Sequence, residues 1–571
     1  MRRVWMGIAL AALAAVLWSG TRAAAPAGQN QLLAAMRAEL ERTMARLSLP
    51  DYAKPYFVAY RLVENDNYRA DAILGAELSE SGGRERKAYV EVRVGDYALD
   101  NTSDRSEFDS FDPDQDTFNY LDYIDLPIED DTDAIRTQLW RLTDLRFKNA
   151  SAAYLNKRAR AVYRENPDGE LHDFTREKPV RHSAPDQPVK LDKKFWKEVL
   201  REASAELKKY PALLDSQAML QTHSGVEYLL NSEGTELRVP SFYFMFYAQA
   251  RALTDDGLTV TDYYSRYARS EAGLPTKQEI IAAVRAMAEQ LVALRAAPVL
   301  DPYDGPAILD PTVSGIFFHE AIGHRLEGDR TRGVDEGQTF KEKVGRKILP
   351  EFLSVIDDPT LRRFGAADLN GYYDFDQEGV PAQRVTLVER GVLRDFLRSR
   401  RPIRQADHSN GHGRADPLHA PMSRMSNLII EAHDTVPVAQ LKDKLLELAR
   451  RKGKPYGLWL RQGMGGETAT DQFNFQAFAN RPVLLYRVDA QTGREELVRG
   501  AELVGTPLLS IGKVEAAGDD PGLFNGYCGA ESGFVPVSVI APSLLVSEIE
   551  IQRVQDKPTK PPVLPPPYAD K

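Results

Sequence analysis

The chain has 571 residues, of which 43% are hydrophobic and 27% are charged, and its formal net charge is −10. This composition can bury a hydrophobic core, and the length predicts more than one domain. The acidic balance argues against a general nucleic-acid-binding protein, which normally presents a basic face, so we expect no nucleic acid among its partners.

The N-terminus has the order of regions found in a secretory signal peptide. Arg2 and Arg3 form a basic start, residues 4–17 are apolar, and small residues follow. The pattern predicts a signal peptide over residues 1–25 and an exported protein, periplasmic or secreted. The alternative is an uncleaved anchor helix, but the apolar run is short for a span of ~20 residues. No later segment reads as a membrane span, so we expect none after cleavage.

Residues 28–297 carry the mixed patterns of an α/β domain. The expected helices cover residues 30–47 and 133–164. Two more are expected to begin near Phe195 and at a capping box formed by Thr276 and Glu279. The expected strands lie near residues 56–64 and 87–95 and in hairpins that turn at 231–234 and 255–257.

An acidic and aromatic segment interrupts this region between residues 99 and 133. The alternating aspartates that begin at Asp112 resemble the start of a calcium-binding loop. Thr117 stands where that loop needs glycine, however, and Tyr123 stands where it needs glutamate. We therefore interpret the segment as a solvated loop.

A domain boundary is expected near Pro298, after the helix that begins at Thr276. Residues 298–555 then form the catalytic domain, and residues 556–571 form a proline-rich tail that we expect to be extended and disordered.

The most informative stretch is FFHEAIGHRLEGD, residues 317–329. It contains His319, Glu320 and His324. The spacing between its two histidines is one residue longer than in the HExxH motif of zinc peptidases. A helix is expected here because Asp310 can cap its start and Pro311 suits its first position.

The spacing of the two histidines conflicts with a regular helix. Positions five apart differ by roughly 140° around an α-helix, so the two rings would not face one ion. Either a π-turn or a break near Gly323 would bring them together. We therefore predict distorted helix at residues 320–324.

A catalytic zinc ion needs three protein ligands and one open position. His319 and His324 supply two ligands, and Glu320 is the candidate general base. The candidates for the third ligand are Glu327, Asp329, His408, His412, His419 and Cys528. Cys528 is favoured, because it is the only cysteine, lies in a glycine-rich stretch and would offer a strong thiolate ligand. The nearby carboxylates fit better as hydrogen-bond partners of the histidines.

Several blocks in the second half of the chain resemble the TldD/PmbA family of zinc metallopeptidases, also described as modulators of DNA gyrase. The blocks are LDPTVSGIFFHEAIGHRLEGD, VIDDPTL, DQEGVPAQRVTLVERGVLRDFL, PMSRMSN and GYCGAESGFVPVSVIAPSLLV. They occur in the family's order over roughly residues 300–552, whereas the first half is only loosely similar.

The resemblance implies an α+β fold with an α/β N-terminal domain and a β-rich C-terminal metallopeptidase domain. It implies Zn²⁺ held by His319, His324 and Cys528, with Glu320 as the catalytic glutamate of the active, TldD-like branch. It also implies unfolded or extended peptide substrates, and a homodimer or a heterodimer with a motif-less TldE/PmbA-like partner. The export signal departs from the family, whose members are cytosolic.

Two other functions remain open from the sequence. Cys528 could be the nucleophile of a cysteine hydrolase, or the chain could be a non-catalytic peptide-binding partner subunit. Candidate substrate-binding residues are Gly465 and Gly466, in the glycine-rich stretch 463–475, and His419.

Overall fold

The computed structural model describes residues 31–102, 123–161, 171–185, 189–332, 338–468, 478–505, 510–554 and 557–569. The predicted signal peptide and the calcium-loop-like aspartates lie outside these ranges. Within them, no helix is both long and apolar enough to cross a membrane.

The N-terminal part is built on one seven-stranded sheet in the order β3-β2-β1-β5-β6-β4, with β7 also paired to β6. Its strands are β1 (Pro55–Ile73), β2 (Ala76–Val94), β3 (Tyr123–Asp125), β4 (Arg181–Ser183), β5 (Leu213–Asn231), β6 (Glu236–Leu253) and β7 (Thr259–Ala268). The expected strands and both hairpin turns are confirmed, although the strands are longer than the patterns indicated.

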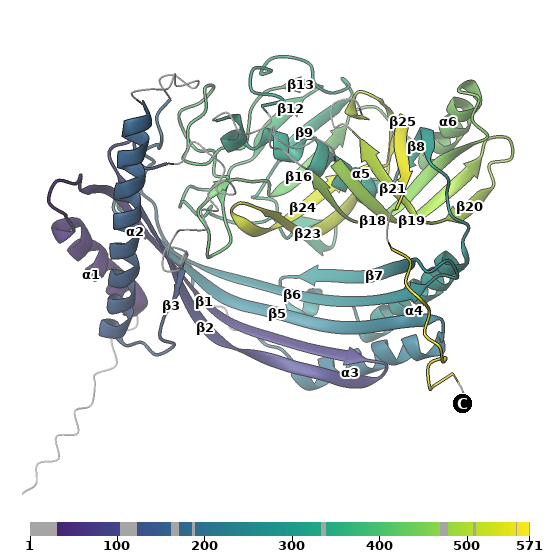
Figure 1. The fold of residues 1–571 in the computed structure, drawn as a ribbon, viewed down its shortest axis with the longest axis horizontal. Coiled ribbons are helices and arrows are strands. Elements are labelled where there is room, and N and C mark those ends of the chain that lie inside the picture. The colour runs from purple at the N-terminus through teal and green to yellow at the C-terminus, as the bar shows by residue number, and fades with distance from the viewer. Residues whose placement is uncertain are drawn as a thin grey trace, which may run out of the picture.

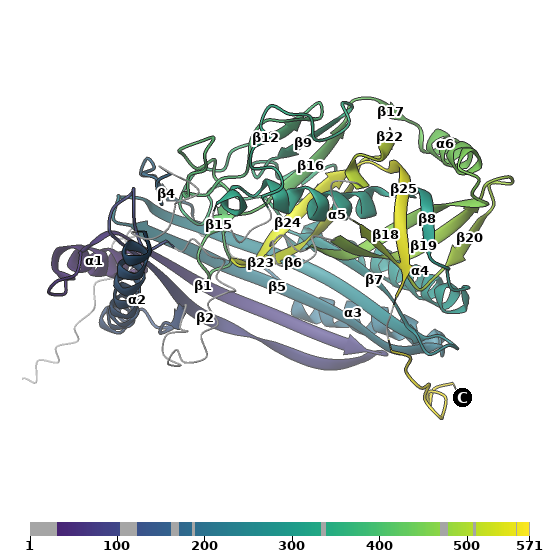
Figure 2. The ribbon, with the colours of Figure 1, turned by 45° about the horizontal axis from the view of Figure 1, so that its top comes forward.

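Four helices cover one face of this sheet. They are α1 (Gln31–Arg46), α2 (Thr132–Ala161), α3 (Lys193–Glu206) and α4 (Lys277–Ala296), and α4 has the expected capping box. Side chains alternate along β1, and Tyr60 and Ala70 project from the same face. Tyr60 packs with α1 and α2 near one end of the strand, and Ala70 packs with α3 and α4 near the other end. The opposite face is therefore left for the C-terminal part, which lies across the long strands (Figures 1 and 2).

The C-terminal part contains two larger sheets. One has six strands in the order β13-β12-β9-β16-β24-β23. They are β9 (Leu353–Asp357), β12 (Val385–Glu389), β13 (Val392–Leu393), β16 (Asn427–Ala432), β23 (Gly522–Ala530) and β24 (Gly533–Ala541). Short two-stranded sheets pair β10 (Arg363–Phe364) with β11 (Ala367–Asp368), and β14 (Gly413–Arg414) with β15 (Met422–Ser423).

The other sheet has eight strands in the order β17-β22-β25-β21-β19-β18-β8, with β20 on β19. They are β8 (Tyr303–Leu309), β17 (Thr435–Val436), β18 (Tyr456–Thr468), β19 (Phe478–Asp489), β20 (Glu495–Val498), β21 (Ala501–Gly505), β22 (Val514–Gly518) and β25 (Leu544–Arg553). Because β8 also pairs with β25, five of these strands close into a ring. Helix α6 (Val438–Arg451) packs on its outer side through Leu441 and Leu445.

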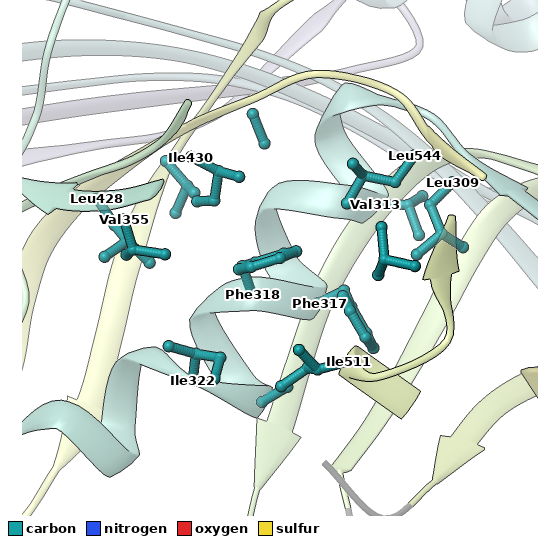
Figure 3. Packing of buried hydrophobic residues seen from close by; sticks show 14 of the residues in the cluster. Leu309, Val313, Phe317, Phe318, Ile322, Val355, Leu428, Ile430, Ile511 and Leu544 are labelled. Atoms are coloured by element: carbon teal, nitrogen blue, oxygen red, sulfur yellow. The ribbon is translucent and has the colours of Figure 1, made fainter. Parts of the chain in front are cut away.

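Helix α5 (Pro311–Ala321) lies between these two sheets, and it carries the histidine motif. It contacts β18 on one side and β23 and β24 on the other. Figure 3 shows Val313, Phe317 and Phe318 within the apolar core that surrounds it. A helix packed on both sides offers a rigid base for a site, because its side chains have little freedom to move.

The two parts of the chain meet through polar contacts as well as apolar ones. Arg269, at the end of β7, donates to the backbone oxygens of Leu369 and Tyr372. In the tail, the N–H of Thr559 donates to the oxygen of Gly257, 2.8 Å away. The division of the chain at residues 297 and 298 stays a prediction.

Candidate metal centre

The start of α5 follows the capping chemistry expected from the sequence. The Asp310 side chain accepts a hydrogen bond from the N–H of Val313 at 2.7 Å, and Pro311 occupies the first helical position. The second oxygen of Asp310 accepts from the N–H of Gln462 at 2.9 Å. The carboxylate therefore caps α5 and also ties it to β18.

The predicted distortion after Glu320 is confirmed, and it takes the form of a break. The α-helix ends at Ala321, and a 3₁₀ helix covers Gly323–Leu326. The tighter turn changes the direction in which His324 projects, so its ring meets that of His319 edge to face with centroids 5.0 Å apart. A π-turn, the other possibility, is not formed.

Gly323 permits this break by its small size. A Cβ at this position would lie 2.0 Å from the sulfur of Met425, which is buried against the helix end. Its φ lies outside the left-handed region, so backbone freedom is not the reason for glycine here. Position 323 requires glycine because Met425 packs closely against the break, and the sequence alone did not indicate this contact.

Three side chains from distant parts of the chain meet beside this break. The Cys528 sulfur, on β23, lies 3.1 Å from Nε2 of His319 and 3.3 Å from Nε2 of His324. All three residues are buried, and their ligand atoms lie within 4.8 Å of one another. Of the six candidates for a third member, Cys528 is the one that the fold brings to the two histidines.

The donor set and its spacing fit a zinc ion. Zinc binds imidazole nitrogen at ~2.0 Å and thiolate sulfur at ~2.3 Å, so tetrahedral ligands lie roughly 3.5 Å apart. The observed separations of 3.1 and 3.3 Å need only a small outward adjustment. Two histidines and one cysteine also leave the fourth position free, as a catalytic zinc site requires.

The electrostatics favour an ionised thiol. Burial by itself would raise the pKa of Cys528, but His324 and His319 hold that pKa well below its ordinary value. Burial likewise opposes the charged form of His324, yet the Cys528 thiolate and Glu327 raise its pKa to about 10. A thiolate is the form of cysteine that binds metals, so the surroundings prepare Cys528 for that role.

Glu327 contacts the His324 ring nitrogen that points away from Cys528. Its Oε2 lies 3.1 Å from Nδ1 of His324 and accepts from Nε of Arg330 at 2.7 Å. Burial opposes ionisation, but His324 and Arg330 hold the pKa of the Glu327 carboxyl far below its ordinary value. Such a carboxylate orients a ligand histidine and increases its basicity, which is the role predicted for Glu327 from the sequence.

For Asp329, the other nearby carboxylate, the predicted contact with a ligand histidine is wrong. It accepts hydrogen bonds from the Ser399 hydroxyl at 2.7 Å and from the N–H of Ser423 at 3.2 Å. These contacts anchor the segment after the 3₁₀ helix.

Arginines around the site were missed by the sequence analysis. Arg424 is fully buried, and its Nη2 donates to the backbone oxygen of Cys528 at 2.7 Å. Arg330 bridges Glu327 and Glu531. A spacing of three residues between Glu327 and Arg330 was a signal for their pairing, but nothing in the sequence placed Arg424 beside Cys528.

Glu320 is buried near the meeting point of the three ligands. Its Oε2 lies 4.0 Å from Nε2 of His324. Burial raises the pKa of Glu320, although His319 and His324 act in the opposite direction. A carboxylate with a raised pKa beside a metal site can accept a proton from water and release it again.

The two glycines predicted to bind substrate differ in their surroundings. A Cβ on Gly466 would lie 2.7 Å from Cγ of Glu320 and 2.8 Å from Cγ2 of Ile316. A Cβ on Gly465 would meet no atom within 4 Å. Gly466 thus packs directly on the candidate base, whereas Gly465 borders open space. Residues 469–475 of this glycine-rich stretch lie outside the described ranges.

The remaining histidine candidates do not join the site. His412 is fully buried, with its ring nitrogens engaged by Asn410 and by Asp357. His408 is exposed and lies 3.3 Å from Glu177. His419 pairs with Asp416 at 2.6 Å and lies beside the turn that links β23 to β24, close to the site but not within it.

Comparison with known proteins gives matches at two levels. Residues 303–553 match the family model for the PmbA/TldA metallopeptidase C-terminal domain. A metalloprotease from Methanocaldococcus jannaschii is 34% identical over 231 residues, which is 40% of this chain and 47% of that protein. A zinc metalloprotease TldD homolog from Saccharolobus solfataricus is 30% identical over 251 residues, 43% of this chain and 51% of that protein. The chain thus spans about half the length of the curated relatives it matches.

Solved structures extend the likeness of fold to the N-terminal part. A modulator of DNA gyrase from Thermotoga maritima superposes with a TM-score of 0.58 at 15% identity, covering 87% of this chain and 96% of that one. TldE from Thermococcus kodakarensis gives a TM-score of 0.57 at 12% identity, covering 91% of this chain and all of that one. The predicted α+β fold is confirmed, and residues 303–553 carry the C-terminal domain of the PmbA/TldD family.

Proposed function

We propose that this chain is a zinc-dependent peptidase whose metal is held by His319, His324 and Cys528. The observation that carries the proposal is the convergence of these three donors beside a buried glutamate. Relatives named metalloprotease and zinc metalloprotease support the same assignment. Bound zinc would supply Lewis-acid activation of water and of the scissile carbonyl.

Glu320 performs the proton transfers in this proposal. Its carboxylate accepts a proton from the attacking water and returns it to the leaving amine. Glu327 holds the His324 ring in position, and Arg424 holds the Cys528 backbone. The apolar core around α5 keeps bulk water away from the reacting groups, which strengthens their electrostatic interactions.

The substrate in this proposal is an extended or unfolded peptide, seated on the free edge of β23. That strand ends its sheet, and among the described residues it pairs only with β24. Tyr527 stands opposite Pro536, which has no N–H to donate, so the backbone N–H and C=O of Tyr527 point toward the free edge. A peptide strand pairing there would be bound mainly through its backbone, next to Cys528.

Assembly and location also belong to the proposal. The likeness in fold to TldE supports a heterodimer with a TldE/PmbA-like partner that lacks the motif, and a homodimer is the alternative. The signal-like N-terminus supports action outside the cytoplasm, in the periplasm or after secretion.

The test combines metal analysis with peptide cleavage. Purified protein should contain about one zinc per chain and cleave unstructured peptides, and a chelator should abolish cleavage until zinc is restored. Cleavage that survives complete metal removal would favour a cysteine hydrolase, since Cys528 already lies 3.1 Å from His319. Zinc binding and peptide binding without cleavage would favour a non-catalytic partner subunit.

A further inference from the structure

Strand β23 has two faces, and only one belongs to the metal centre. Side chains alternate along a strand, so Cys528 and Tyr527 point to opposite sides of the sheet. Cys528 and its partner Val535 are buried in the core around α5. Tyr527 faces the other way, together with Phe534 and Pro536 of β24, and it is 42% exposed while Phe534 is 69% exposed.

These exposed side chains border a cavity of about 360 Å³ between the two parts of the molecule. Its floor is the helix-free face of the N-terminal sheet, where Tyr243 meets the Tyr527 ring edge to face with centroids 6.3 Å apart. Its remaining walls come largely from segments 370–377 and 414–417. The volume is within the range of pockets that enclose small ligands.

A strand paired with β23 would present its side chains to both of these faces. Residues directly opposite each other in paired strands project on the same side of the sheet. A peptide residue opposite Cys528 would therefore face the metal centre, and its neighbour in sequence, opposite Tyr527, would face the cavity. No rearrangement of the peptide is needed to reach both places.

We propose that this cavity is a specificity pocket for the substrate residue adjacent to the one that faces the metal, and that it accepts an aromatic side chain. The inference rests on the proposed peptidase function and adds a substrate preference to it. Rings prefer edge-to-face and offset contacts with other rings, and Tyr243, Tyr527 and Phe534 offer such contacts. Arg61 and Glu227 also line the cavity, so a ring with a polar tip, such as that of tyrosine, fits there as well as the ring of phenylalanine.

The experiment uses full-length zinc-loaded Glu320→Gln protein, so that binding is measured without turnover. Fluorescently labelled eight-residue peptides of alanine and serine carry one phenylalanine, moved through every position. The peptide with phenylalanine at one particular position should bind at least roughly tenfold more tightly than the peptide without phenylalanine, given the apolar area that a ring buries. Placing the Phe534→Ala substitution in the same protein should reduce that advantage to about twofold, and Phe534→Tyr should preserve it.

Phe195→Ala is the matched control, since Phe195 is another exposed phenylalanine but lies on α3, on the far face of the N-terminal sheet. It should leave the advantage unchanged. The proposal is overturned if phenylalanine gains nothing at any position, or if Phe534→Ala keeps the full advantage. It is also overturned if Phe534→Ala changes only the oligomeric state, because a second copy then occupies the cavity. Failure of wild-type protein to cleave peptides would instead count against the peptidase function, since this assay measures binding alone.

Discussion

Two histidine-containing regions of the C-terminal part differ in what surrounds their rings. At the end of α5, the Nε2 atoms of His319 and His324 both lie within 3.3 Å of one cysteine sulfur. In segment 408–419, His412 is just as buried, but oxygen atoms of Asn410 and Asp357 engage both of its ring nitrogens. Burial is common to both regions, and the partner atoms decide which of them can bind a metal.

The difference shows why a count of histidines is a poor guide to a metal site. Both nitrogens of the His412 ring contact oxygen atoms of neighbouring residues, so neither is directed at an open ligand position. His324 instead uses Nδ1 for Glu327 and directs Nε2 toward Cys528. A metal-binding histidine usually has this arrangement: one ring nitrogen makes a hydrogen bond that orients the ring, and the other nitrogen faces the metal position.

The largest expected effect comes from removing the candidate base. Glu320→Gln should reduce kcat by roughly 10²–10⁴-fold, because the carboxylate no longer transfers the proton. Zinc content should stay at the wild-type level, since Glu320 is not among the three ligands. Peptide cleavage assays and metal analysis on the same sample check both points, and near-normal cleavage would exclude Glu320 as the base.

Replacing the thiolate tests the metal-binding side of the comparison directly. Cys528→Ser should weaken zinc binding by at least about 100-fold, more than the loss of an outer hydrogen-bond partner typically costs. His408→Ala, at an exposed histidine of the other region, should leave zinc binding unchanged. Competition with a zinc chelator measures both variants, and equal affinity in the two would remove Cys528 from the ligand set.

A matched pair of substitutions tests whether Glu327 orients the His324 ring. Glu327→Gln should weaken zinc binding by roughly 10–100-fold, because the ring loses its charged partner. Asp329→Asn changes a buried carboxylate two residues away that contacts Ser399 and Ser423. It should lower thermal stability without changing zinc affinity, so the same loss of zinc in both variants would contradict the assignment.

Adjacent glycines give a finer test of how the site is held. Gly466→Ala should displace the Glu320 side chain and reduce kcat about tenfold with zinc content unchanged, because small misplacements of catalytic groups are costly. Gly465→Ala should behave as wild type, since its added methyl group meets open space. Equal activity of the two variants would mean that β18 does not position Glu320.

The smallest expected effect concerns a buried carboxyl that, unlike Glu327, receives hydrogen bonds only from amide groups. Asp262 accepts from the N–H of Tyr263 and from the side-chain amide of Gln462, and burial raises its pKa to about 7. The folded state therefore binds its proton more tightly than the unfolded state does. The stability contributed by the protonated form is complete below about pH 4 and is lost as the pH rises through 7.

Asp262→Asn should imitate the protonated form at every pH. It should raise the melting temperature by roughly 2–5 °C at pH 8 and by much less at pH 5. Thermal unfolding at the two pH values measures the difference. An equal change at both would show that the titration of Asp262 does not contribute to stability.

Much of the local structure could be predicted from local residue patterns. The helix starts at Asp310 and Thr276 follow from capping chemistry that involves only neighbouring residues. The distortion near Gly323 followed from the five-residue spacing of the histidines, which no regular α-helix can accommodate at one ion. Its form is a 3₁₀ break packed closely against Met425, a residue about one hundred positions away that this spacing does not indicate.

The sequence by itself determined the chemistry available to this protein: two histidines beside a glutamate, one cysteine, and the blocks that resemble the PmbA/TldD family. Only the tertiary structure decided which residues meet. Cys528 reaches the histidines because β23 packs against α5, and the same strand turns Tyr527 toward a cavity formed with the N-terminal sheet. Such contacts between residues about two hundred positions apart follow from the packing of sheets and helices, which no local pattern encodes.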